Sequence, residues 1–89
     1  MKIGKMYMIN PDKGAERSYP IYNDDRLHHL SRYMEKNETF VLIEYAKGNK
    51  DSYFPDICYL RILAEDGSVY RMMINSMFLE QDIIEMHHT

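Results

Sequence analysis

Residues 57–75 contain the pattern that most restricts the fold of this chain, because two alternating segments flank a tight turn. In ICYLRILA and in VYRMMIN, apolar side chains recur at every second position, which is the period of a strand with one buried face. The four residues between them, EDGS, have the chemistry of a hairpin turn. We therefore predict an antiparallel hairpin. Its apolar face would carry Cys58, Leu60, Ile62, Tyr70, Met72 and Ile74, and its opposite face Tyr59, Arg61, Arg71 and Met73.

Three other segments are predicted to form strands. Residues 2–10 are apolar and β-prone, and turn-forming residues follow them. Residues 77–86 follow a polar break, and we expect one helical turn at 77–79 and a short closing strand at 83–86. The remaining strand is predicted at residues 38–46, whose alternation directs one set of side chains inward, namely Val41, Ile43 and Tyr45.

The region between the first two predicted strands is expected to hold a loop and a helix. Residues 15–23 are interpreted as a long loop, because Pro20 favours an extended backbone before it. Asp24 or its neighbour Asn23 can cap a helix. Residues 25–36 then show the i, i+3, i+7 spacing of an amphipathic helix, carried by Leu27, Leu30 and Met34.

Length and composition indicate one ordinary globular domain over residues 1–89. The chain is 45% hydrophobic and 28% charged, unlike disordered or fibrous proteins. A formal net charge of -3 argues against holding a polyanion by bulk electrostatics. The single cysteine, Cys58, excludes an internal disulfide and is expected to be a core residue. Since the chain has neither an apolar run of about 20 residues nor a signal peptide, we expect a cytoplasmic protein that does not enter the membrane.

The order of these elements resembles that of bacterial SH3-like domains. In that family a segment of the form L-x-K-G-x-x-V-x-V is common, and MEKNETFVLI at residues 34–43 is similar to it. A second segment, G-x-x-Y-V followed by a break and a Y-L pair, is similar to GSVYRM at 67–72 and MFL at 77–79. The resemblance implies a mainly β, five-stranded SH3-like small barrel, with the helix at 25–36 as an insertion. Another small α+β fold is the alternative.

Metal binding and catalysis find no support in the motifs. The pairs His28-His29 and His87-His88 lack the spacing of C-x-x-C or H-E-x-x-H sites, and adjacent side chains on a helix point about 100° apart. No nucleophile elbow or glycine-rich phosphate loop is present. We therefore expect a protein that is not an enzyme and that needs no cofactor or metal.

Aromatic and basic side chains are the candidate partner-binding residues. Tyrosine offers a flat apolar wall and a hydroxyl, so tyrosines beside the long loops of an SH3-like barrel can line a groove for an extended peptide. Packing within a small core is the alternative role for the same side chains. The loop and strand-end candidates, besides Tyr7, are Tyr19, Tyr22, Tyr53 and Phe54. A second candidate surface, which could equally serve a homodimer, comprises Tyr59, Arg61, Arg71 and Met73.

Two function classes follow from these observations. The first is a non-enzymatic protein-interaction module, and a small acidic chain with no evident tail suits an adaptor or inhibitor of the kind that bacteriophages and mobile elements encode. The alternative is a nucleic-acid-binding small β-barrel that uses Tyr59 as a stacking surface. Its cationic side chains would be Lys2, Lys5, Lys13, Arg17, Arg61 and Arg71.

Overall fold

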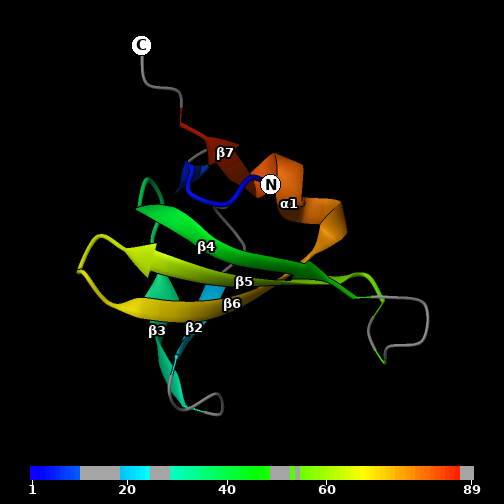
Figure 1. Ribbon diagram of the computed structural model, residues 1–89, viewed down its shortest axis with the longest axis horizontal. Coiled ribbons are helices and arrows are strands. Elements are labelled where there is room, and N and C mark those ends of the chain that lie inside the picture. Colours follow the sequence, from blue (N-terminus) through cyan, green and yellow to red (C-terminus); the bar gives the residue numbers. More distant parts are fainter. Residues whose placement is uncertain (11–18, 25–28, 49–52, 54, 87–89) are drawn as a thin grey trace.

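The computed structural model describes residues 1–10, 19–24, 29–48, 53 and 55–86, and within them the chain is mainly β (Figure 1). The elements in chain order are β1 (Met6–Ile9), β2 (Tyr19–Asn23), β3 (Leu30–Met34), β4 (Thr39–Lys47), β5 (Ile57–Ala64), β6 (Val69–Asn75), α1 (Ser76–Asp82) and β7 (Ile83–Glu85).

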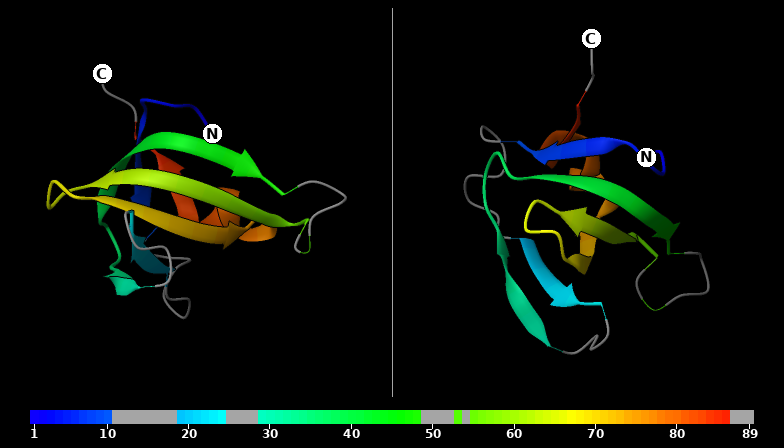
Figure 2. Two further views of the ribbon diagram at one scale, coloured as in Figure 1. Left: turned by 60° about the horizontal axis from the view of Figure 1, so that its bottom comes forward. Right: turned by 60° about the vertical axis from the view of Figure 1, so that its left-hand side comes forward.

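All the described strands join one antiparallel sheet in the order β3-β2-β6-β5-β4-β1-β7. The sheet curls into a half-barrel, and Figure 2 shows strands β4 to β6 bending across the molecule between the two edges. The described residues therefore form seven strands where the sequence predicts five. The two additional strands, β2 and β3, form a hairpin that pairs with the edge of β6.

The hairpin of β5 and β6 confirms the prediction for residues 57–75. The pairing places Leu60 opposite Met72 on the buried side and Tyr59 opposite Met73 on the other side. Gly67 occupies the left-handed region at φ 84°, which glycine adopts without a Cβ penalty. All six residues predicted to face inward are buried, and they include Cys58.

The core lies inside the curl of the sheet. It combines the inner face of the β5–β6 hairpin with side chains from each of the remaining strands. Within it, the Tyr7 ring stacks on the Phe40 ring, with the ring centroids 5.9 Å apart. Tyr7 is therefore a core residue, so of the two roles considered for it, partner binding and packing, the structure shows packing. Phe78 and Leu79 of α1 pack against the same cluster, so the helix helps to cover it.

The predicted inward face of β4 is wrong in the first half of the strand and correct in the second half. Phe40 and Leu42 are buried, whereas Val41 and Ile43 are half-buried and do not belong to the core cluster. A bulge after Leu42 adds one residue and shifts the alternation, so that Tyr45 packs against the core. Both faces of this segment are apolar, and a period of two cannot choose between such faces.

The helix predicted at residues 25–36 is also wrong, because residues 30–34 form β3; residues 25–28 lie outside the described part of the chain. Leu30 is 47% exposed and Met34 is buried, so these two side chains do not share one core-facing stripe. Backbone pairing with β2 supplies the hydrogen bonds that a helix would have made internally.

Strand β2 forms where a loop is predicted. Tyr19 and Ile21 are buried, and both anchor this strand to the core. Pro20, which has no backbone N–H, is tolerated because the pairing of β2 with β6 begins only at Ile21. Tyr19 is consequently a core residue and not part of a partner-binding surface, which corrects its assignment as a candidate site residue.

The last elements confirm the predicted helical turn and closing strand. Asn75 caps α1, since its side-chain oxygen accepts a hydrogen bond of 2.9 Å from the Met77 backbone N–H. The helix continues to Asp82, beyond the single turn that was expected, and β7 then pairs with β1.

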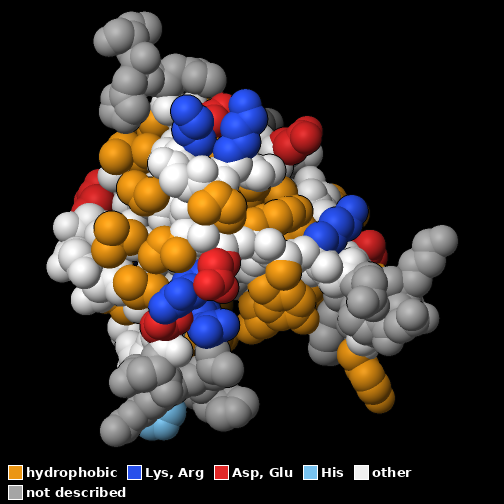
Figure 3. Space-filling view, in the orientation of Figure 1, with side chains coloured by type: hydrophobic (Ala, Val, Ile, Leu, Met, Phe, Trp, Pro, Cys, Tyr) orange, Lys and Arg blue, Asp and Glu red, His pale blue; other side chains and the backbone are white. Residues whose placement is uncertain are grey.

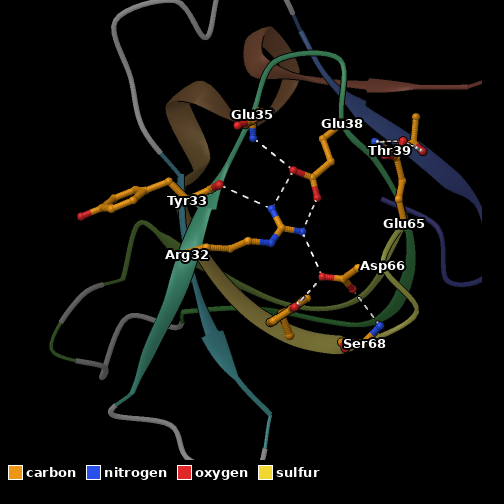
Figure 4. Close-up of polar contacts among 9 residues, drawn as sticks. Arg32, Tyr33, Glu35, Glu38, Thr39, Glu65, Asp66 and Ser68 are labelled. Atoms are coloured by element: carbon orange, nitrogen blue, oxygen red, sulfur yellow. Dashed lines mark hydrogen bonds and ion pairs between the residues drawn. The ribbon is translucent and has the colours of Figure 1, made fainter.

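A polar cluster around Arg32 joins β3 to the turn of the β5–β6 hairpin (Figure 4). The Arg32 guanidinium donates two parallel hydrogen bonds to Glu38, at 2.8 and 2.6 Å, and contacts Asp66 at 3.4 Å. Its guanidinium carbon lies 5.4 Å from the centre of the Tyr70 ring, and the Tyr70 hydroxyl donates to Asp66 at 2.6 Å. Bidentate arginine–carboxylate pairs are geometrically specific, so this Arg32 cluster fixes β3 against the β5–β6 turn.

Two tyrosines give a matched test of this packing. Tyr19→Phe is expected to leave the free energy of unfolding unchanged or to raise it by up to about 1 kcal/mol, because the buried Tyr19 hydroxyl has no hydrogen-bond partner among the described residues. Tyr70→Phe is expected to lower it by about 1 kcal/mol, because Asp66 loses a hydrogen bond while the ring under Arg32 remains. Urea denaturation of both variants measures the difference, and equal losses in the two would contradict it.

Candidate partner-binding groove

A groove with a volume of about 430 Å³ lies on the face of β4–β6 that points away from the core. Figure 3 shows hydrophobic side chains on the face over these strands, beside a cluster of basic and acidic ones. The volume lies within the usual range for ligand sites. The residues that line it are Tyr22, Glu44, Tyr45, Ala46, Tyr59, Leu60, Arg61, Arg71, Met72 and Met73.

Two cross-strand rows build this β4–β6 groove, and the first is apolar. It runs across β4, β5 and β6 as Ala46, Tyr59 and Met73, which are direct register partners. Tyr59 is 40% exposed and Met73 47% exposed, so both present apolar surface to solvent. Side chains directly opposite one another on one face of a sheet are close enough to touch, and this row therefore forms one continuous apolar wall.

The second row is charged and lies next to the first. It crosses the same strands as Glu44, Arg61 and Arg71, and the pairing of β2 with β6 adds Tyr22 opposite Arg71. Two arginines face each other directly in this row, an arrangement that like charges disfavour unless an anion neutralises them.

Asp24 supplies that anion from the end of β2. Its carboxylate accepts hydrogen bonds from Arg61 Nε at 2.8 Å and Arg61 Nη2 at 2.7 Å, and from Arg71 Nε at 3.1 Å. The bonds from Arg61, assisted by the charge of Arg71, lower the pKa of Asp24 below its ordinary value of 3.8. Asp24 thus joins three strands and holds the end of β2 against the groove.

The two arginines differ in how many of their hydrogen-bond donors already have acceptors among the described residues. Arg61 also contacts Glu44 at 3.3 Å, so two carboxylates surround its guanidinium. Arg71 shares Asp24 through Nε only, and its two Nη atoms have no acceptor among the described residues. The Arg71 side chain is 44% exposed. Arg61 therefore has a structural role, and Arg71 presents two donors that have no acceptor in the described part of the chain.

The structure brings together five of the eight sequence-predicted site residues in this groove, namely Tyr22, Tyr59, Arg61, Arg71 and Met73. The others are elsewhere: Tyr19 is in the core, Tyr53 is 95% exposed and does not line the groove, and Phe54 lies outside the described residues. Sequence reasoning missed Glu44 and the role of Asp24, which it assigned to a helix cap. Asp24 reaches the two arginines because β2 pairs with β6, and no pattern in the sequence predicts that pairing.

Two further hollows occur in the described structure. One is polar and surrounds the Arg32 cluster, with Glu35, Lys36 and Glu65 among its lining residues. The other lies beside α1 and β7, with Lys2 and Tyr7 at its wall. Within the described residues, no three His, Cys, Asp or Glu side chains gather closely enough to hold a metal ion, and His28, His87 and His88 fall outside that part of the chain.

Comparisons of the chain with protein-family models, with curated proteins and with solved structures find no match. In the part of the chain that the structure describes, no helix has the length and apolar content that crossing a membrane requires. The geometry of the groove is thus the basis for assigning a function.

The carboxylates of this fold predict loss of stability in acid. Hydrogen bonds from Arg61 to Asp24, from Tyr70 to Asp66 and from Thr39 to Glu65 lower the pKa of each carboxyl group. A lowered pKa in the folded state stabilises the fold above the ordinary pKa, and this stabilisation disappears as the pH falls through the folded value.

We therefore expect the urea midpoint to fall steeply below about pH 4. Asp24→Asn should lower the midpoint near neutral pH and flatten its acid dependence, because the variant has no carboxyl group to protonate at this position. Asp56→Asn, at an exposed aspartate outside both clusters, is the control and should keep the wild-type profile. An Asp24→Asn profile parallel to the wild-type one between about pH 6 and about pH 2 would contradict this assignment.

Proposed function

We propose that this protein is a non-enzymatic protein-interaction module, an adaptor or inhibitor that binds an extended segment of a partner protein in the β4–β6 groove. The observation that carries the proposal is the apolar row of Ala46, Tyr59 and Met73 beside the exposed guanidinium of Arg71. Tyrosine, methionine and arginine are enriched in protein interfaces, and exposed aromatic side chains lose little conformational entropy on binding.

The order of the strands supports an SH3-like arrangement as part of this proposal. Five strands, β1, β4, β5, β6 and β7, with α1 before the last, follow the expected sequence of a first strand, three meandering strands, a short helix and a closing strand. The β2–β3 hairpin then occupies the long first loop. In such a fold the groove beside this loop accepts extended peptides, and Tyr22 from β2 lines the groove here.

The nucleic-acid alternative has less support. Arg61 is surrounded by Asp24 and Glu44, and Lys2 lines a different hollow, beside α1. Lys13 and Arg17 lie outside the described residues. A nucleic-acid strand carries a phosphate on every nucleotide and requires several uncompensated cations along one track, whereas both arginines among the described lining residues of this groove contact Asp24.

Selection of the protein against a displayed library of random linear peptides tests the proposal. We expect peptides that bind the wild-type protein and lose affinity about tenfold or more with Tyr59→Ala, because truncating a central aromatic removes much of an interface's stabilisation. Tyr33→Ala is the matched control, since Tyr33 is 52% exposed on β3 and does not line the groove. Fluorescence anisotropy of the selected peptides measures both affinities.

The control variant should bind within about twofold of the wild-type protein. Equal losses in Tyr33→Ala and Tyr59→Ala would place binding outside the groove and contradict the proposal. A dimer that dissociates with Tyr59→Ala, measured by sedimentation velocity, would instead assign this face to self-association.

A further inference from the structure

We propose that the β4–β6 groove selects an extended peptide that carries a carboxylate and, two positions away, an apolar side chain, with the carboxylate bound by Arg71. The inference deepens the proposed function and rests on it. It names the chemistry of the partner segment: an aspartate, a glutamate or a terminal carboxylate placed against the Nη atoms of Arg71, and an apolar side chain placed against Tyr59 and Met73.

The hydrogen-bond donors and acceptors that remain unfilled in the groove decide which ligand group fits. Asp24 is engaged by three hydrogen bonds from the two arginines, and Glu44 contacts Arg61. Both anions of the groove therefore already have cationic partners. Arg71 retains two Nη atoms without an acceptor among the described residues, so the unfilled positions are hydrogen-bond donors on a cationic side chain. An incoming carboxylate completes its hydrogen bonding, whereas an incoming lysine or arginine would compete for Asp24.

The geometry of Arg71 favours a carboxylate over other acceptors. The bond of 3.1 Å from Nε to Asp24 restricts the plane of the guanidinium. A guanidinium held in this way presents its Nη atoms as two parallel donors, which match the two oxygens of a carboxylate. The pairing of Arg71 with Tyr22 places an aromatic side chain on the same face of the sheet, and both residues line the groove.

The apolar row specifies the second feature of the peptide. Met73 is two residues from Arg71 on β6, so both side chains project from the same face of the strand. An extended peptide also repeats its side-chain direction every two residues, at about 6.4 to 6.8 Å. A peptide that runs along β6 can thus place a carboxylate at Arg71 and an apolar side chain, two positions away, between Tyr59 and Met73.

The experiment compares the peptides that wild-type protein and charge variants select from a displayed library of random linear peptides. The wild-type protein should enrich aspartate or glutamate at one position with an apolar residue two positions away. Arg71→Gln should bind those peptides about tenfold or more weakly, and Arg71→Glu should enrich lysine or arginine at the same position. Lys36→Gln, which removes an exposed cation outside the groove, is the control and should bind like the wild-type protein.

The failure of this inference is distinguishable from failure of the proposed function. Peptides that depend on Tyr59 but show no acidic preference, or that bind Arg71→Gln as tightly as the wild type, would overturn the carboxylate assignment and leave the groove as the binding site. A library that yields no Tyr59-dependent peptide would overturn both. Salt-sensitive binding of single-stranded DNA that is lost with Arg71→Gln, in place of peptide binding, would also overturn both.

Discussion

The structure depends on the burial of one face of the β5–β6 hairpin. Leu60, Ile62 and Met72 on that face are almost completely shielded from solvent. A flat two-stranded hairpin cannot bury its own apolar side, so the sheet must extend and curl around it. Strand β5 is accordingly the middle strand of the sheet, with three strands on either side of it, and the half-barrel closes over the hairpin's inner face.

The β2–β3 hairpin is held against this body by two sets of arginine–carboxylate contacts. From the middle of β3, Arg32 contacts Glu38 and Asp66, the latter in the β5–β6 turn. Asp24 joins the end of β2 to Arg61 and Arg71. Exposed ion pairs stabilise proteins only weakly, so we interpret their main effect as orientation. The Asp24 contacts lie in the groove, so the same carboxylate orients the β2–β3 hairpin and shapes the proposed site.

Of the candidate site, the sequence predicted only the part that lies on the outer face of the β5–β6 hairpin. Alternation alone placed Tyr59, Arg61, Arg71 and Met73 on a common surface, and the structure brings them together. Tyr22 lies with them only because β2 pairs with β6, which joins residues that are far apart in the chain. Tyr19, three residues earlier on the same strand, is paired with Met34 of β3 and is buried in the core. Composition treats these two tyrosines alike, and only their places in the sheet distinguish them.

Local sequence patterns were sufficient to predict the β5–β6 hairpin, its turn and its buried face, because period-two alternation and turn chemistry act between neighbouring residues. They also predicted the helical turn and closing strand at the end of the chain. Tertiary structure decided the face of β4, where a bulge shifts the alternation, and the strand at β3 in place of a helix. In both segments the local pattern is compatible with two arrangements. The neighbouring strands determine which arrangement forms, because backbone hydrogen bonds and burial depend on partners that are distant in sequence.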